Sequence, residues 1–538
     1  MIDLPRPAPE SLPAWQHLLA HARGLSTRPI IGLFREDPLR AGTFALEWDG
    51  LYLDYSKQLV DAPARQALAD LARETLLAEG IKALFSGALV NHTEGRAVLH
   101  MALRDPALAP PGDRPEVDQT RARMTALAED FRAGRLMGAA GHPLDTVVNL
   151  GIGGSDLGPR MAVEALAAGP GKVHFVANID ARDFQETVAG LDPARTLFII
   201  SSKSFGTAET LSNARAARQW LGQLGVPEEA LDTHFVAVSN AVAAARHFGI
   251  APERILPLPE WVGGRFSVWS AIGLPLLLAI GPTAFDQFLA GGRAMDQHFR
   301  SAPILENLPV LMGLVGLWNT VFLGAETLAV LPYAHGLRSF PAYLQQLEME
   351  SNGKRVRADG SPVAGHTAPI VWGGAGTIGQ HAFHQLFYQG TRRVPLDFIV
   401  PAGGAGPAQQ GLVDNALAQA AALMQGRDAA TAAALLAARG LPATEVARLT
   451  PHLVCPGNQP STTLLFDALT PYRLGQLVAL YEHKVFVQGW LWGINSFDQY
   501  GVELGKEMAR NLASGQGGEA DPSTAILARR VAALQGRT

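Results

Sequence analysis

The sequence predicts an α/β protein in which two domains each hold a parallel β-sheet flanked by helices. Apolar runs typical of strands alternate with helical segments between residues 146 and 239. A similar strand, which ends in glycines and precedes a helix, recurs at residues 368–374. The chain has 538 residues, which is too long for one ordinary hydrophobic core. Strands that alternate with helices at this spacing form parallel sheets covered on both faces.

The predicted elements follow in order along the chain. Trp15 and Leu18 share one face of an early helix, residues 63–82 have helical apolar spacing, and residues 42–60 alternate as a short hairpin around Asp49-Gly50. Four strand candidates, each before a helical segment, are residues 146–150, 172–177, 196–201 and 234–239. Later we expect strands at 368–374 and 393–401, a loop at 403–410, a helical segment at 416–439 and a loosely held tail.

The composition is that of a large globular protein. Hydrophobic residues make up 48% and charged residues 17% of the chain, whereas a disordered chain has fewer apolar residues and more net charge. The net charge of −5 gives no reason to expect a nucleic-acid partner. A single cysteine, Cys455, excludes an intramolecular disulfide and thiolate-rich metal sites, and it fits the reducing cytoplasm.

Neither a leader nor a membrane span is expected. The N-terminus has no basic segment followed by an apolar one, so it does not resemble a signal peptide. The uncharged run 307–325 is long enough to span a bilayer. It contains Pro309 and Asn319 and has no basic flanks, so we expect a buried helix and no membrane partner.

A glycine-rich loop, Gly151-Ile152-Gly153-Gly154-Ser155-Asp156, lies between a predicted strand and a predicted helix. Glycines let a ligand approach the backbone, and the free N–H groups at a helix start favour phosphate. Tight turns also use glycine for packing, so this loop alone leaves both interpretations open.

A second loop, residues 201–210, repeats this arrangement with the sequence Ser-Ser-Lys-Ser-Phe-Gly-Thr-Ala-Glu-Thr. The hydroxyls of Ser202, Ser204 and Thr207 and the ammonium of Lys203 suit phosphate oxygens. Helix capping alone would explain only one hydroxyl. The two loops together favour a phosphate ester, and neither has the spacing of a nucleotide-binding loop.

Four further segments carry candidate catalytic groups. Arg265 follows two glycines, so its guanidinium could approach a substrate and stabilise an oxyanion, with a structural salt bridge as the alternative. Glu348 and Glu350 lie two residues apart and face different directions on a helix, and either could be a solvated surface group.

His381 and His384 are one helical turn apart and could in principle share a metal. No acidic residue at helical spacing completes a ligand set, so we expect no metal. A histidine can transfer protons near neutral pH, and a lysine such as Lys506 can polarise an oxygen, although a lone lysine is normally a surface residue.

Several segments together resemble the signature motifs of the phosphoglucose isomerases. The most specific are residues 263–273, Gly-Gly-Arg-Phe-Ser-Val-Trp-Ser-Ala-Ile-Gly, and residues 497–506, Phe-Asp-Gln-Tyr-Gly-Val-Glu-Leu-Gly-Lys. Other matches follow in family order between residues 34 and 510, at 54–57, 91–96, 152–158, 202–210, 349–354, 379–387 and 457–461. The length resembles the longer form of the family.

The resemblance implies two sugar-isomerase domains and a homodimer with active sites at the subunit interface. The implied parts are a mainly helical N-terminal region, 1–110, which packs on the larger domain, a smaller domain, 111–290, a larger domain, 291–515, and a C-terminal tail, 516–538.

The implied activity is the reversible isomerisation of glucose 6-phosphate and fructose 6-phosphate through ring opening and a cis-enediol, without a cofactor. Glu350 is then the base, Arg265 stabilises the enediolate, and Lys506 with His381, supplied by the neighbouring subunit, serves ring opening. The other matching residues contact the substrate or its phosphate: Gly154, Ser155, Ser202, Lys203, Ser204, Thr207, Gln346 and Gln499. Gly206 departs from the family, which often has a threonine there, and leaves one hydroxyl contact open.

Two alternatives remain. A non-catalytic regulator that binds sugar phosphates would need the phosphate loops but not Glu350, His381 and Lys506 together. An isomerase that also accepts mannose 6-phosphate or an amino sugar would differ around C2, where the sequence identifies no residue. For the isomerase we expect Glu350→Gln to nearly abolish activity and Glu348→Gln to do little by comparison.

Overall fold

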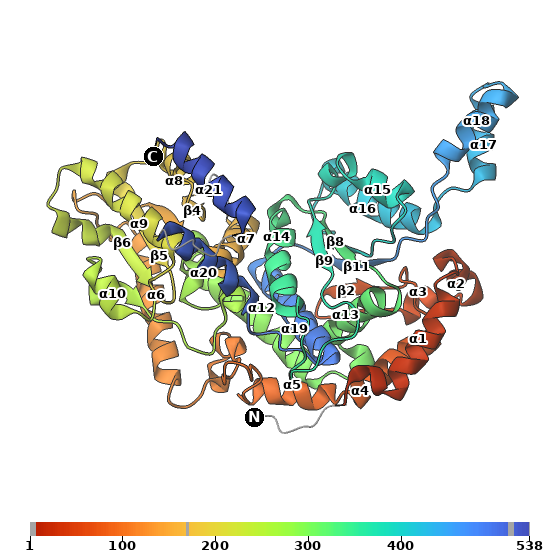
Figure 1. The fold of residues 1–538 in the computed structure, drawn as a ribbon, viewed down its shortest axis with the longest axis horizontal. Helices are drawn as coiled ribbons and strands as arrows, with labels where there is room; N and C mark the ends of the chain where they lie inside the picture. The colour runs from red at the N-terminus through yellow and green to blue at the C-terminus, as the bar shows by residue number, and fades with distance from the viewer. Residues whose placement is uncertain (1–6, 168–171, 515–520, 537–538) are drawn as a thin grey trace. The chain divides into compact units, whose positions relative to one another are not determined.

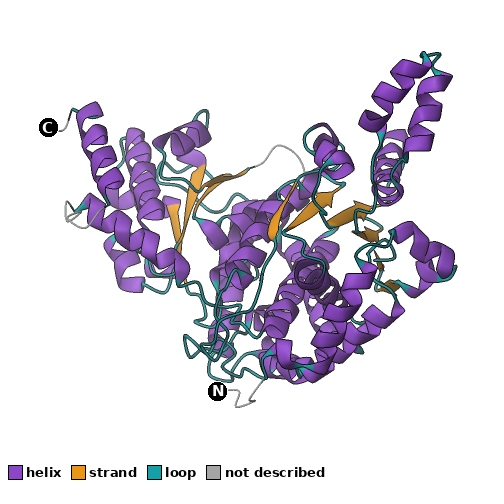
Figure 2. Cartoon of the chain, turned by 45° about the vertical axis from the view of Figure 1, so that its right-hand side comes forward, coloured by secondary structure: helices purple, strands orange, loops and turns teal. Residues whose placement is uncertain are grey.

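The computed structural model describes residues 7–167, 172–514 and 521–536 (Figure 1). The chain divides into two compact units, Met1–Ser496 and Phe497–Thr538. The first unit contains two β-sheets, and helices flank both of them, as Figure 2 shows. The predicted α/β class is therefore confirmed.

The first sheet is parallel throughout and has the strand order β4-β3-β5-β6-β7. Its strands are β3 (Thr146–Leu150), β4 (Val173–Val176), β5 (Thr196–Ser201), β6 (Phe235–Val238) and the unpredicted β7 (Ile255–Leu256). The helices between them are α7 (Leu157–Leu166), α8 (Ala181–Val188), α9 (Ala208–Leu221) and α10 (Val242–His247). All four predicted strands are confirmed, and all lie within the predicted range 111–290.

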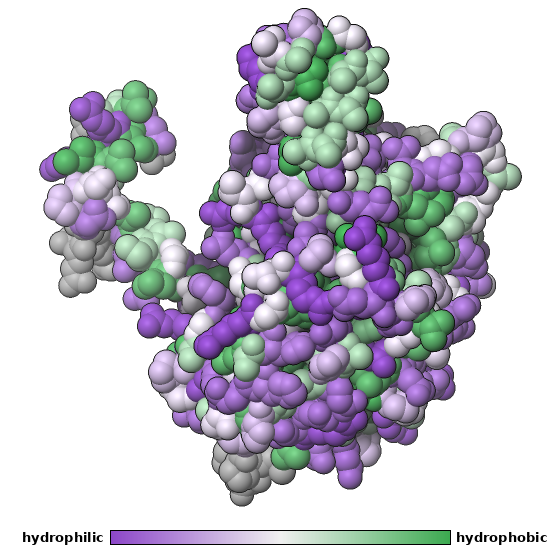
Figure 3. Space-filling view, turned by 90° about the vertical axis from the view of Figure 1, so that its right-hand side faces the viewer, coloured by the Kyte–Doolittle hydropathy of each residue, from purple (hydrophilic) through white to green (hydrophobic). Residues whose placement is uncertain are grey.

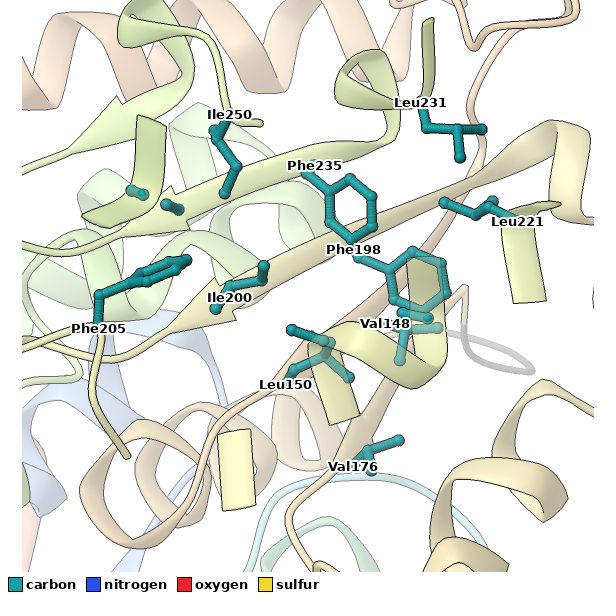
Figure 4. Close-up of a cluster of buried hydrophobic side chains, with 14 of the residues drawn as sticks. Val148, Leu150, Val176, Phe198, Ile200, Phe205, Leu221, Leu231, Phe235 and Ile250 are labelled. Atoms are coloured by element: carbon teal, nitrogen blue, oxygen red, sulfur yellow. The ribbon is translucent and has the colours of Figure 1, made fainter. Parts of the chain in front are cut away.

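Apolar side chains of this sheet and its helices form a continuous core (Figure 4). Phe198 of β5 stacks on Phe235 of β6 with ring centroids 5.7 Å apart. Phe205 also lies in this core, although it belongs to the loop that follows β5. The core therefore anchors the middle of the second predicted phosphate loop.

The second sheet is mixed and has the strand order β1-β2-β11-β10-β8-β9. Four strands are parallel: β8 (Thr327–Pro332), β9 (Ile370–Gly373), β10 (Leu396–Pro401) and β11 (Ser461–Phe466). The hairpin of β1 (Ala45–Trp48) and β2 (Leu51–Asp54) adds an antiparallel edge, because β2 pairs with β11. β9, β10 and the hairpin were predicted, whereas β8 and β11 were not.

The N-terminal region is mainly helical, as expected. Asp49 and Gly50 both have positive φ, at 46° and 73°, which a type I′ hairpin turn requires. The predicted helical stretch 63–82 forms two helices, because Leu76 adopts a left-handed conformation between them. The helices of this part are α1 (Pro13–Leu25), α2 (Ile30–Glu36), α3 (Arg40–Thr43), α4 (Ala62–Glu74) and α5 (Leu77–Phe85). The next helix, α6 (Arg114–Arg132), lies within the predicted range 111–290.

A long helix, α19 (Pro471–Trp492), is buried from Arg473 to its end and packs closely on α12 (Pro282–Ser301). The uncharged run 307–325 forms the buried α13 (Leu308–Leu317) and a following π-helical turn. In the parts of the chain that the structure describes, no helix is long and apolar enough to cross a bilayer. Three further helices of the first unit are α11 (Leu274–Ile280), α14 (Phe340–Gln345) and α15 (His384–Gln389).

Two predictions for residues 403–439 need correction. The predicted loop 403–410 ends early, because α16 (Pro407–Gln425) begins with a proline, which suits the first turn of a helix. The predicted helical segment 416–439 is split at Gly426, after which α17 (Ala429–Ala438) begins. α17 and α18 (Ala443–Leu453) pack mainly on each other and form a hairpin that extends away from the second sheet (Figure 1).

The second unit contains α20 (Gly501–Ala513) and α21 (Pro522–Leu534). Within the predicted tail 516–538, residues 522–534 are thus helical, and 516–520 and 537–538 lie outside the described residues. On the face shown in Figure 3, hydrophilic residues predominate, and hydrophobic residues gather mainly on the projection at the top of the view.

Candidate active site

The two glycine- and serine-rich loops are joined by one buried side chain. Asn149 of β3 donates from Nδ2 to the carbonyl oxygen of Ser155 at 3.0 Å. Ser201 Oγ, at the end of β5, donates to Asn149 Oδ1 at 2.9 Å. β3 and β5 are parallel neighbours, so both loops leave the same edge of the sheet. The structure therefore brings the two predicted phosphate loops together.

Gly154 allows a third loop to approach them. A β-carbon built on Gly154 would lie 2.0 Å from the carbonyl oxygen of Gly264, so no other residue fits without moving one backbone. Ser267 Oγ lies 3.5 Å from the carbonyl oxygen of Gly154 and donates to that of Gly264 at 2.6 Å. Arg265 follows Gly264 and is thereby placed beside the glycine-rich loop.

The second loop presents its hydroxyls unevenly. Ser202 Oγ and Thr207 Oγ1 lie 3.2 Å apart, and Thr207 immediately precedes α9, where free N–H groups begin. Ser204 is exposed. The next residue, Phe205, is buried and has a positive φ of 46°. A non-glycine residue in this conformation stores strain, which the burial of the phenyl ring offsets.

Lys203 contacts a carboxylate that the sequence did not single out. Its Nζ lies 3.2 Å from the carbonyl oxygen and 3.3 Å from Oε2 of Glu260. Burial would raise the pKa of Glu260, but a hydrogen bond from Asn240 and the charge of Lys203 lower it overall. Glu260 therefore stays ionised and limits the positive charge that Lys203 adds to the loop.

The guanidinium of Arg265 is buried and held on three sides. Its Nε donates to Ser351 Oγ at 2.7 Å, and its Nη2 donates to the carbonyl oxygen of Ser496 at 2.6 Å. Its Nη1 lies 3.9 Å from Oε1 of Glu350. This arrangement fixes a permanent positive charge next to a carboxylate that remains accessible.

The two glutamates near residue 350 have different surroundings, as the sequence predicts. Residues Gln346–Glu350 form a π-helical turn that continues α14, and such turns are frequent at functional sites. The side chain of Glu350 is 22% exposed and lies beside Arg265. The side chain of Glu348 is 3% exposed, and Lys484 Nζ donates to its Oε2 at 2.7 Å.

This buried pair changes the expected effect of Glu348→Gln. From the sequence alone, no loss of stability was expected for that change. Loss of one partner of a buried ion pair costs about 3–5 kcal/mol, because the other charge stays in the core. We therefore expect Glu348→Gln to reduce stability.

Gln346 joins the same site. A β-carbon on Gly153 would lie 3.2 Å from Gln346 Nε2, so this amide is adjacent to the glycine-rich loop. Glu350, Arg265 and Gln346 are thus brought together with the loop of Gly153 and Gly154. A base, a fixed cation and an anion-binding loop in one place suit proton transfer on an anionic substrate.

The two histidines of the segment 379–387 differ in burial. His381 is exposed at the end of a short 3₁₀ turn, Ile378–His381. His384 is buried, and its Nδ1 lies 3.2 Å from Gln419 Oε1. The described part of the chain holds no group of three or more His, Cys, Asp or Glu that could bind a metal ion.

Gln499 and Lys506 belong to the second unit. Lys506 is exposed on α20, and its Nζ lies 2.8 Å from Glu503 Oε1, one helical turn away. In that unit Gln499 precedes the first turn of α20. Their predicted roles in ring opening and substrate contact remain predictions.

Sequence reasoning missed Asn149, Glu260 and Ser351, which position the predicted residues. Asn149 had a detectable signal, since it is an amide in the otherwise apolar end of a strand that precedes the glycines. Glu260 and Ser351 had none, because an exposed glutamate and a serine beside a helix end are common on any surface.

Comparison with known proteins gives one consistent result. The family model for phosphoglucose isomerase matches residues 54–527. A protein of Aromatoleum aromaticum named glucose-6-phosphate isomerase is 62% identical over 536 residues, which are 98% of this chain and 98% of that one. A protein of Ectopseudomonas mendocina with the same name is 51% identical over 512 residues, 93% of this chain and 92% of that one. The crystal structure of a glucose-6-phosphate isomerase from Chlamydia trachomatis has a TM-score of 0.85 and 32% identity, and the match covers 98% of this chain and 100% of that one.

Proposed function

Because the chain belongs to the phosphoglucose isomerase family, we propose that it interconverts glucose 6-phosphate and fructose 6-phosphate. The observation that carries this proposal within the structure is the pair of Glu350 and Arg265. An accessible carboxylate lies 3.9 Å from a buried guanidinium, next to a loop suited to phosphate.

Glu350 acts as the base in this proposal. It removes the proton from C2 of the open-chain sugar and returns it at C1 through a cis-enediol. A carbon acid is far weaker than a carboxylic acid of pKa about 4.3, and each pKa unit of mismatch adds about 1.4 kcal/mol to the step. Arg265 offsets part of this cost, because its fixed charge stabilises the enediolate oxygen as negative charge develops. Only protons move, so the reaction needs no redox cofactor.

The phosphate binds between the two loops at the edge of the first sheet. Ser202 and Thr207 supply hydroxyls that lie close together, and Ser155, Ser204 and Lys203 complete the set. Gly154 of the first loop and Gln346 of the adjacent π-turn are the proposed contacts to the sugar. Binding of the non-reacting phosphate positions C1 and C2 at Glu350, which is a remote use of binding energy.

Ring opening is assigned to His381 and Lys506, with Gln499 as a further substrate contact. His381 comes from the second subunit of a homodimer. Its exposure supports this, because a histidine that faces solvent in one subunit is free to complete a site in another. Ile378 and Leu386 flank it and are 67% and 42% exposed, as expected for residues that a subunit interface covers.

Mixed dimers test the shared site. We expect His381→Asn and Glu350→Gln each to be nearly inactive alone. When the two variants exchange subunits, one site of each mixed dimer regains both groups, so about a quarter of the wild-type activity should return. Differently tagged subunits would verify the exchange, and exchange without any recovery would show that each site draws both residues from one chain.

The isomerase proposal is tested by a coupled assay on purified protein. Fructose 6-phosphate is supplied with EDTA present, and glucose 6-phosphate is followed through its dehydrogenase. Robust activity is the expected outcome, because the proposed groups are all side chains of the protein. If there is no activity while fructose 6-phosphate still raises Tm, the chain is a sugar-phosphate-binding regulator and the isomerase proposal fails.

The proposed location is the cytoplasm. The single cysteine, Cys455, is unpaired and partly buried, which fits a reducing compartment.

A further inference from the structure

The buried helix α19 carries four consecutive polar side chains, Tyr481 to Lys484, in the middle of the first unit. Each contacts a different part of the fold, and such a run of buried polar groups is unusual. Their partners are Asp397 in β10, Arg104 after α5, Asp296 in α12 and Glu348 in the π-turn. α19 therefore contacts several segments that are far apart in the sequence. One of them is the π-turn that contains the proposed base, Glu350.

Lys484 and Glu348 form a buried ion pair that joins the π-turn to α19. Both side chains are 3% exposed, with Nζ and Oε2 2.7 Å apart. Among the described residues, nothing hydrogen-bonds the other oxygen of Glu348. The nearby Asp397 accepts a hydrogen bond from Tyr481, and burial raises its pKa to about 6. Lys484 is therefore the group that fixes the direction of Glu348.

The residues after the turn are held by the same helix and by Arg265. Asn352 Nδ2 donates to the carbonyl oxygen of Val485 at 3.0 Å. Ser351 Oγ accepts from Arg265 Nε at 2.7 Å. Glu350 thus lies between two residues that α19 holds, Glu348 and Asn352. Ser351, in the same segment, also orients Arg265.

We propose that Lys484 is a positioning residue for Glu350, because through Glu348 it holds the π-turn in the register that places the Glu350 carboxylate beside Arg265. This inference rests on the proposed isomerase function. An α-helical register in this turn would rotate Glu350 about the helix axis. A displacement of the base of about 1 Å can lower the rate about 10²-fold.

Lys484→Met tests this role, with His483→Gln as the matched control. His483 is the adjacent residue of α19, is equally buried, and its Nε2 lies 2.7 Å from Asp296, away from the π-turn. Both variants should lower Tm. Lys484→Met leaves the buried Glu348 carboxylate without its cation, and His483→Gln disturbs a buried hydrogen bond to Asp296, which keeps Arg104 as its ion-pair partner. At a temperature where both are folded, Lys484→Met should lower kcat about 10–100-fold with KM within about threefold, whereas His483→Gln should leave kcat within about twofold of wild type.

A double variant, Glu348→Gln with Lys484→Met, removes both charges and covers the case in which Lys484→Met does not fold. Its Tm should recover relative to Lys484→Met, because Glu348 no longer leaves a buried charge without its partner. Its kcat should stay low, since the turn has lost the contact that directs it.

Three outcomes would overturn the inference: wild-type kcat in Lys484→Met, recovery of kcat with Tm in the double variant, or an equal loss of kcat in His483→Gln. An inactive wild-type protein would instead contradict the proposed function itself, so the two failures are distinguishable.

Discussion

Glu350→Gln is expected to lower kcat about 10³-fold or more and to leave the affinity for fructose 6-phosphate nearly unchanged. The amide keeps the size of the carboxylate but cannot accept the proton from C2, so the general base is lost. The side chain is 22% exposed, and its nearest cation, Arg265, is also held by Ser351 and Ser496, so the fold should persist. Steady-state kinetics and calorimetric titration with fructose 6-phosphate would measure the two effects separately.

Glu164→Gln is a suitable control for this change. Glu164 is 23% exposed and lies 3.1 Å from an arginine, Arg338, so its exposure and its arginine neighbour resemble those of Glu350. It lies near the end of α7, outside the group formed by Glu350, Arg265 and Gln346. The control should keep wild-type kcat. If Glu350→Gln kept more than about a tenth of the activity, the base would have to be another residue.

Arg265→Lys should lower kcat about 10²–10³-fold, because an ammonium cannot keep the guanidinium contacts and still face the substrate. In the native site Arg265 holds Ser351 Oγ and the carbonyl oxygen of Ser496 while one nitrogen faces Glu350. The lysine should also leave one buried acceptor without a partner and so reduce the free energy of unfolding by about 1–3 kcal/mol.

Arg40→Lys separates the effect on stability from the effect on catalysis. Arg40 is equally buried, and its Nε and Nη2 donate to the carbonyl oxygens of Ser56 and Gln58 at 2.8 and 2.7 Å. Denaturant unfolding should show a similar loss for both lysine variants, whereas only Arg265→Lys should lose activity. Equal kcat values in the two variants would mean that Arg265 is structural.

The sequence was most informative where local chemistry determines local structure. The type I′ turn at Asp49-Gly50 requires positive φ at two positions, and the Asp-Gly pair indicates it directly. Strands β3 to β6 of the first sheet are short apolar runs that each precede a helix, so their limits were predicted well, whereas the two-residue β7 was not predicted. The contrast between Glu348 and Glu350 follows from their spacing on a helical turn.

Other features depend on contacts between distant residues and could not be predicted in this way. β11 has the sequence Ser-Thr-Thr-Leu-Leu-Phe, which shows neither clear alternation nor a continuous apolar run, and it becomes a strand because β2 and β10 pair with it. The break between α16 and α17, in contrast, had a local signal that the sequence prediction overlooked, since Gly426 adopts a positive φ of 68° and the Asp428 side chain caps α17. The burial of Glu348 by Lys484 joins residues 136 positions apart.

The pairing of β2 with β11 also has a consequence for the order in which the protein is made. Asp54 pairs with Thr463, so the partner of an early strand is synthesised near the end of translation. A ribosome that adds about 5–20 residues each second delivers β11 roughly 20–80 s after β2. During this interval one edge of the β1–β2 hairpin has no strand beside it and is open to wrong partners. The first sheet consists of residues 146–256 and can therefore form much earlier. A nascent chain of this protein thus contains one complete sheet before the last parallel strand of the second sheet, β11, has been synthesised.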